Sequence, residues 1–163
     1  MMKQLSISAA LLVCTAAQAA GVSPKNLVGG WHCETRAEIA QGETETVYRA
    51  DGTFQAKELV RIKAADGSEW AYAIEGDGTW SLNKQKLTET PQQASIERRY
   101  SDETSAALAA SPELQAEETA LFALLQQAVQ DHTPQTYTVT RLDKQHFDVE
   151  QDDFRSRCIR KYS

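Results

Sequence analysis

The sequence predicts a mainly β domain, in which an antiparallel meander of about eight strands closes into a barrel. Three observations predict this fold. Apolar and polar residues alternate with a period of two along most of the chain, Asp-Gly pairs separate several alternating runs, and one helical segment interrupts the pattern before the last three strands. Many short antiparallel strands that each have one apolar face are typical of a closed or curled sheet.

The first alternating run predicts a half-buried strand near the start of the domain. Odd positions from Leu27 to Ile39 are apolar or small, whereas the even positions from His32 to Glu38 are polar or charged. Residues 43–50 continue the alternation and predict a second strand.

Three Asp-Gly pairs predict the turns that follow, because Asp-Gly supplies the positive φ angles of tight hairpins. The pairs are Asp51-Gly52, Asp66-Gly67 and Asp77-Gly78. The segments between them alternate well and are expected to be strands. After the third pair we expect a short strand around Leu87, a turn near Pro91 and another strand over residues 94–100.

A helical insertion is expected over residues 102–132, which are rich in Ala, Leu, Glu and Gln. Ser111-Pro112-Glu113 is a typical helix start, with a Ser cap, Pro in the first turn and an acidic residue after it. The spacing predicts an amphipathic helix over residues 112–131, preceded by a shorter helix over 102–110. The apolar stripe of the longer helix includes Leu114, and Glu118 is expected to fall largely outside it.

Alternation returns after Pro134 and predicts three more strands, around Tyr137, Phe147 and the segment from Phe154 to Tyr162. Asp143-Lys144 and Gln151-Asp152-Asp153 are the turns expected between them. The total is eight or nine strands, with the helical insertion before the last three.

Residues 1–19 are expected to be a cleavable signal peptide, and residues 20–163 a single domain. Lys3 precedes an uncharged apolar run that ends in Ala17-Gln18-Ala19, an Ala-x-Ala cleavage signature. The run is short for a membrane span, which takes about 20 residues. A membrane anchor and lipidation at Cys14 are the alternatives. The mature protein is therefore expected in the periplasm or secreted, with no transmembrane segment.

The composition of the mature chain limits the classes of partner that we expect. Removing residues 1–19, which hold one basic and no acidic residue, leaves 144 residues with 16 basic and 23 acidic side chains. This acidic balance argues against a nucleic-acid partner. It also leaves Cys33 and Cys158, which in an exported protein predict a disulfide between the first and last strands. The alternatives are two free thiols or half of a metal site.

The start of the first strand, Gly29-Gly30-Trp31, resembles the Gly-x-Trp signature of lipocalin-like (calycin) barrels. In that family a basic residue of the last strand packs over this Trp, and Arg157 or Arg160 matches the position, with Arg160 as our choice. The resemblance covers the opening motif and the meander. The chain departs from the family pattern because its helix precedes the last three strands. The resemblance implies a barrel that binds small apolar molecules.

No catalytic, cofactor or metal motif emerges from the sequence, so we expect a protein that is not an enzyme and takes no cofactor. The three histidines, His32, His132 and His146, lack the spacing of a metal site and are expected on the surface. Cys33 neighbours His32, but adjacent strand residues point to opposite faces.

The candidate ligand-binding residues are polar side chains in phase with apolar strand faces. Glu58, Arg98, Arg141 and Arg160 each share a face with apolar neighbours, and a charge buried alone is costly. We interpret them as a Glu58–arginine network in the barrel lumen that receives a polar or anionic ligand. The alternative is that strand ends and bulges place them in solvent.

Two aromatic residues, Trp70 and Tyr72, complete the candidate binding set, with core packing as the alternative. We therefore expect an exported, non-enzymatic binding protein of the cell envelope that holds a small molecule in its barrel. The alternative function is a protein–protein surface, for instance toward an envelope partner, on a barrel with a filled core.

Overall fold

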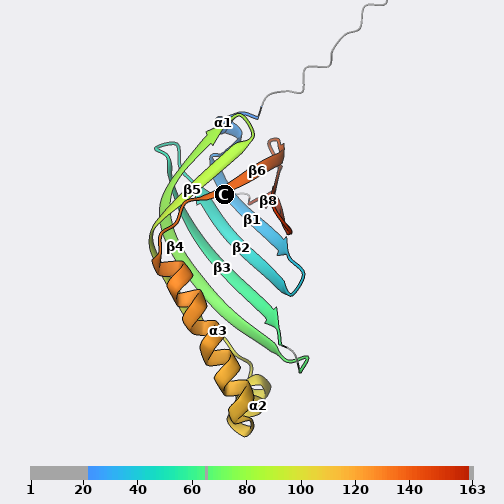
Figure 1. Ribbon diagram of the computed structural model, residues 1–163. Helices are drawn as coiled ribbons and strands as arrows, with labels where there is room; N and C mark the ends of the chain where they lie inside the picture. Colours follow the sequence, from blue (N-terminus) through green and yellow to red (C-terminus); the bar gives the residue numbers. More distant parts are fainter. Residues whose placement is uncertain (1–21, 65, 162–163) are drawn as a thin grey trace, which may run out of the picture.

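The computed structural model describes residues 22–64 and 66–161, and these form a closed barrel of eight antiparallel strands (Figure 1). The predicted signal peptide and Cys14 lie outside the described residues. Each strand pairs with the next along the chain, and β8 pairs with β1. The strands are β1 (Gly29–Arg36), β2 (Ala40–Tyr48), β3 (Thr53–Lys63), β4 (Glu69–Asn83), β5 (Lys86–Arg98), β6 (Gln135–Leu142), β7 (His146–Gln151) and β8 (Phe154–Arg160).

The barrel closes where the first and last strands meet, as the cysteine pair predicts. Cys33 of β1 lies directly opposite Cys158 of β8, and the two form a disulfide across 125 residues of chain. Both cysteines are buried on the inner face, with Trp31 on the same face of β1. The alternation in the first run therefore separates the inner and outer faces of the barrel wall.

One of the three predicted Asp-Gly turns is wrong. Gly52 and Gly67 do form turns, with φ of 82° and 87°. At Asp77-Gly78, by contrast, β4 continues without a turn, and its register against β5 shifts there. A Cβ on Gly78 would lie 2.2 Å from the backbone oxygen of Thr90, so this glycine permits the close approach of two strands.

The shift has a second consequence in β5. The turn expected near Pro91 is absent, and β5 runs as one strand from Lys86 to Arg98. The proline sits at the irregular register between the two strands, where a missing N–H is tolerated. The hairpin between β4 and β5 turns instead at Lys84, whose φ is 55°.

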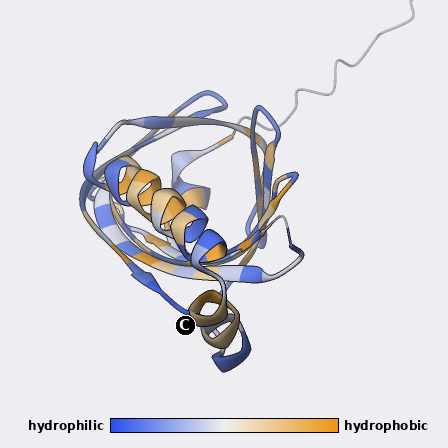
Figure 2. Cartoon of the chain, turned by 60° about the horizontal axis from the view of Figure 1, so that its bottom comes forward, coloured by the Kyte–Doolittle hydropathy of each residue, from blue (hydrophilic) through white to orange (hydrophobic). Residues whose placement is uncertain are grey.

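In the described part of the chain, three helices accompany the barrel: α1 (Pro24–Leu27), α2 (Asp102–Ala110) and α3 (Pro112–Gln130). Ser101 and Ser111 cap α2 and α3, because their hydroxyls accept hydrogen bonds from the backbone N–H of Thr104 and Leu114. Seen from the end that carries α2 and α3, α3 lies within the outline of the ring of strands (Figure 2). Within residues 22–64 and 66–161, no helix is both long and apolar enough to cross a membrane.

The apolar core fills the end of the barrel next to α1, opposite the end that carries α2 and α3 (Figure 1). Leu27 of α1 and Trp31 of β1 are fully buried, and the indole N–H of Trp31 donates to the Leu27 carbonyl at 2.7 Å. Tyr48 and Phe147 pack edge to face against each other in the same core, at 6.1 Å between ring centroids. One end of the barrel is therefore closed by aromatic packing.

Candidate functional site

A cavity of about 170 Å³ lies in the barrel lumen next to this core. Its apolar wall contains the Cys33–Cys158 disulfide and core side chains from several strands. The rest of the lining is polar, and it consists of hydroxyl and carboxyl groups. These polar residues are Thr35, Thr44, Thr46, Ser156, Tyr48, Tyr137, Glu58 and Glu89.

The small hydroxyls come from β1, β2 and β8, at alternate positions that point inward. Thr35 of β1 faces Ser156 of β8 in register and donates its hydroxyl at 3.1 Å. Thr46 of β2 is 6% exposed and lines the cavity, yet its hydroxyl has no hydrogen-bond partner among residues 22–64 and 66–161. Among the described residues, the Trp70 indole nitrogen is the buried side-chain polar atom that lacks a partner, so the Thr46 oxygen is accessible from the cavity, where water or a ligand group can bond to it.

Glu89 places the first carboxyl in the lumen, from β5. The hydroxyl of Tyr48, on β2, donates a hydrogen bond to it. Burial raises the pKa of Glu89, the hydrogen bond from Tyr48 opposes that rise, and the negative charge of Glu58 adds to it. Burial also holds the pKa of the Tyr48 hydroxyl well above its ordinary value, so this group stays protonated and donates.

Glu58 places the second carboxyl there, from β3. It lies opposite Thr44 of β2, whose hydroxyl stabilises the charged form, but burial outweighs this and raises the pKa of Glu58. The carboxyl has room because the residue beside it is Gly42. A Cβ at Gly42 would lie 3.0 Å from Glu58 Oε1.

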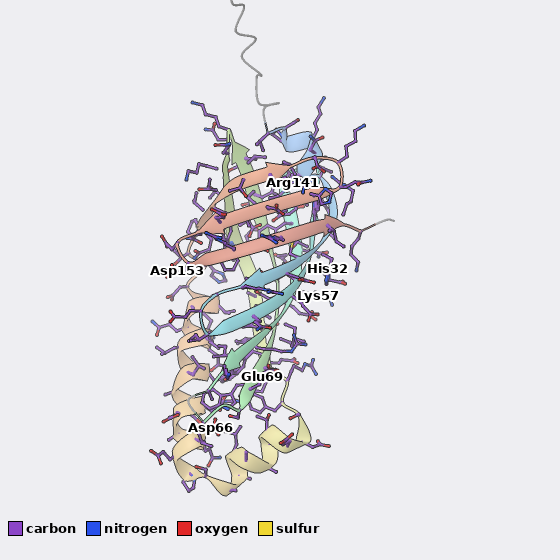
Figure 3. The ribbon with its side chains drawn as sticks, turned by 90° about the vertical axis from the view of Figure 1, so that its right-hand side faces the viewer. His32, Lys57, Asp66, Glu69, Arg141 and Asp153 are labelled. Atoms are coloured by element: carbon purple, nitrogen blue, oxygen red, sulfur yellow. A yellow bond between two sulfur atoms is a disulfide. The ribbon has the colours of Figure 1, made fainter. Side chains whose placement is uncertain are left out.

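The predicted network between Glu58 and the arginines is wrong, and Arg141 shows one reason. The register of β6 shifts between Val139 and Arg141, and this bulge reverses the face of the following side chain. Arg141 is therefore exposed and lies 2.9 Å from Asp143 and 2.8 Å from His146 Nδ1. Figure 3, in which β6 to β8 face the viewer, labels it.

Arg160 lies at the closed end of the barrel. Its guanidinium carbon is 4.2 Å from the ring centroid of Trp31, in the arrangement that the resemblance to lipocalin-like barrels implies. It also donates to the backbone carbonyls of Val28, at 2.8 Å, and Asn26. Arg160 therefore joins the last strand to the segment before the first one, and it is not part of the cavity lining.

Arg98 and Tyr72 meet beneath α3, where Glu118 holds them. Arg98 donates to both oxygens of Glu118, at 3.0 and 3.1 Å, and Tyr72 donates at 3.2 Å. Tyr100 also donates to Glu118, and Arg98 lies 3.6 Å from the ring centroid of Phe122. The inner faces of β4 and β5 thereby anchor α3.

The hydrogen bonds to Glu118 offset the cost of removing its carboxylate from water. Burial alone would raise the pKa of Glu118, but the hydrogen bonds from Arg98 and Tyr100 outweigh it and hold that pKa below its ordinary value. Burial also raises the pKa of Tyr72 to about 12. Trp70, the last predicted site residue, is 5% exposed on the same strand, and its indole N–H has no partner among the described residues.

Two residues of these clusters, Glu118 and Glu89, were not predicted from the sequence, although a signal existed for both. Glu118 was expected outside the apolar stripe of α3, yet it is 4% exposed. It lies four residues from both Leu114 and Phe122 and so shares their helical face. Glu89 lies two residues after the buried Leu87, so alternation places both side chains on the inner face of β5. The turn expected near Pro91 shortened the predicted strand around Leu87, and Glu89 was therefore not recognised as a lumen residue.

The histidines lie away from the lumen. His32 and His146 line a shallow hollow on the outer face of β1, β7 and β8, together with Arg141 (His32 and Arg141 are labelled in Figure 3). Among residues 22–64 and 66–161, no group of three or more metal-ligating side chains gathers.

Comparisons with known proteins leave the family open. No model of a protein family matches the sequence. No curated protein matches it either. A similar solved structure is that of an uncharacterized protein from Bacteroides eggerthii DSM 20697, with 15% sequence identity and a TM-score of 0.42. The alignment covers 83% of this chain and 99% of the other.

Proposed function

We propose that this protein is a non-enzymatic binding protein that holds a small polar molecule in its barrel lumen. The observation that carries the proposal is the cavity itself, where hydroxyl and carboxyl groups converge without filling the space. Polar groups in a half-enclosed cavity need hydrogen-bond partners, and a ligand supplies them in place of water.

The size of the cavity limits what it holds. A binding barrel was expected to contain a cavity of several hundred Å³, in the range of drug-sized ligand sites. The volume of about 170 Å³ equals the liquid volume of five or six water molecules. The ligand is therefore small, or only one end of it enters the lumen.

The chemistry of the lining favours a polar ligand. The resemblance to lipocalin-like barrels implies a preference for apolar molecules, and such ligands would leave the carboxyls of Glu58 and Glu89 and the hydroxyl of Thr46 without partners. The alternative function, a protein–protein surface on a barrel with a filled core, receives less support, because the lumen retains this cavity.

The disulfide supports a location outside the cytoplasm, since stable disulfides persist mainly in oxidising compartments. We therefore propose that the protein acts in the periplasm or after secretion. A signal peptide, as predicted for residues 1–19, would direct the protein to such a compartment.

Native mass spectrometry of the protein purified without reductant from its own compartment tests the binding function. We expect a stoichiometric small-molecule adduct. Ala56→Leu, which fills part of the lumen, should abolish the adduct, whereas Ala73→Leu on the opposite face of the wall should retain it. A bare chain in all three samples would contradict the proposal.

A further inference from the structure

The charge of the lumen identifies the class of its ligand, and this inference rests on the proposed function. Glu58 and Glu89 project into one cavity from β3 and β5, two strands separated by β4. Both carboxyls line this one cavity, and burial raises the pKa of Glu89, with a smaller rise from the charge of Glu58. Two carboxylates that share a half-buried site repel each other, which favours protonation of one of them, and a cation between the two relieves the repulsion.

No cation of the described chain reaches these carboxyls. Within residues 22–64 and 66–161, neither Glu58 nor Glu89 forms an ion pair, and the cavity lining contains no Lys or Arg. The arginines predicted as partners bind other groups, because Arg98 donates to Glu118 and Arg160 donates to backbone carbonyls at the closed end. The arrangement therefore lacks a positive charge.

A further hydroxyl in the cavity also lacks a partner. Thr46 is 6% exposed and lines the same cavity, and its hydroxyl makes no hydrogen bond within residues 22–64 and 66–161. Its oxygen can accept a hydrogen bond from a ligand donor, as the carboxylates can. An ammonium group, with three N–H donors and no acceptor, suits these oxygens.

The remaining wall suits a short organic body. Tyr137 and Phe154 line the cavity and lie 5.8 Å apart between ring centroids. Aromatic faces attract cations and also pack against methylene groups. The cavity volume of about 170 Å³ exceeds what a bare metal ion needs and suits a molecule of several non-hydrogen atoms.

We propose that the lumen binds a small organic ammonium ion, whose charged nitrogen lies between the carboxylates of Glu58 and Glu89. The protonated amine interacts with both carboxylates and compensates one of their two negative charges, and its carbon chain lies against Tyr137 and Phe154. Binding therefore weakens in acid, when the two carboxyls take up protons. Because burial raises the pKa of both, this loss begins at a higher pH than an ordinary Glu would give.

Isothermal titration of the mature, oxidised protein at pH 7.5 tests this assignment. The probes are 1,4-diaminobutane and butylamine, with 1-butanol as the uncharged analogue and calcium chloride as the metal control. We expect each amine to bind at least about tenfold more tightly than 1-butanol. Glu58→Gln and Glu89→Gln should each weaken amine binding about tenfold or more.

Glu97→Gln is the matched control, because it removes the same charge from the exposed face of β5. It should bind the amines as the wild type does. Far-UV circular dichroism and melting temperature verify that each variant folds. Equal binding of amine and alcohol, no amine binding at millimolar concentration, amine binding unchanged in both lumen variants, or calcium binding in the amine's place would overturn the assignment.

The two proposals fail in different ways. If the native protein carries an adduct that Ala56→Leu removes, while the amine preference is absent, the binding function stands and the ligand class is wrong. If no adduct is found and neither amines nor alcohol bind, the binding function itself fails.

Discussion

Tyr48 on β2 and Glu89 on β5 form a hydrogen bond across the barrel lumen, between strands that are separated by two others. The bond joins opposite walls of the barrel at the boundary between its filled core and its cavity. The donor is the hydroxyl of Tyr48, and the ring of this residue packs in the core. We therefore expect it to stabilise the closed barrel.

Tyr48→Phe should lower the free energy of unfolding by about 1–3 kcal/mol at neutral pH, because it leaves the half-buried Glu89 carboxylate without its donor. Urea denaturation measures the change. Tyr137→Phe is the control, since Tyr137 faces the same carboxyls and donates no side-chain hydrogen bond to them within the described residues. Equal losses in the two variants would show that the bond across the lumen has no special role.

Glu58→Gln should stabilise the ligand-free protein at pH 7.5. Because burial raises the folded-state pKa of Glu58 above its unfolded value, the wild type has its full stability below the unfolded pKa and loses part of it as pH rises through the folded pKa. The variant has no such loss. Its advantage should therefore be largest at neutral pH and above, and it should disappear near the ordinary pKa of Glu, at about pH 4.

Denaturation midpoints between pH 4 and pH 8 measure this advantage, with Glu97→Gln as the exposed control on the outer face. An advantage for Glu58→Gln that stays constant over this range would contradict the assigned titration. Stabilisation combined with loss of amine binding would show that Glu58 is retained for binding and at a cost in stability.

Much of this architecture was predictable, because period-two alternation directly reports which side of a barrel wall a residue faces. The two cysteines added the closure of the barrel, since a disulfide requires that β1 and β8 be neighbours. The serine caps of α2 and α3 were equally local signals, and the helices begin where Ser101 and Ser111 place them.

The errors arose where two strands must fit each other, which a single strand does not report. Asp77-Gly78 has the composition of a turn, but the glycine serves the close contact with β5. The bulge before Arg141 depends on the register of β7 and turns a predicted lumen residue outward. The alternation of β3 was enough to predict that Glu58 faces the lumen. Its predicted partner Arg98 instead pairs with Glu118 of α3, and the sequence does not indicate which strands that helix packs against.

Glu118→Ala should release α3 from the barrel wall without unfolding the barrel. The change removes the acceptor for Arg98, Tyr72 and Tyr100 together. We expect a loss of about 2 kcal/mol, less than for a fully buried ion pair because the Arg98 side chain is 40% exposed. Hydrogen exchange should increase in α3 and remain slow in β1 and β8.

Acid should have the same effect on the wild type. Because the folded-state pKa of Glu118 is lowered, its contribution is present above the unfolded pKa and is lost as pH falls through the folded value. Protection of α3 should therefore decline below about pH 4. Glu117→Ala, at an exposed position on the same helix, is the control and should leave α3 protected. Slow exchange in Glu118→Ala would show that other contacts hold the helix.

Reduction of the Cys33–Cys158 disulfide should destabilise the barrel without opening it. The bond closes a loop of 125 residues, for which chain entropy predicts about 5 kcal/mol as an upper figure, and native disulfides typically contribute about 2–4 kcal/mol. The β1–β8 ladder, with six paired positions, holds the same seam in the reduced protein. Guanidinium denaturation with and without reductant measures the difference, and the double variant Cys33→Ala/Cys158→Ala should be insensitive to reductant. If reduced wild type retains the oxidised midpoint, the strand ladder alone determines the stability of the seam.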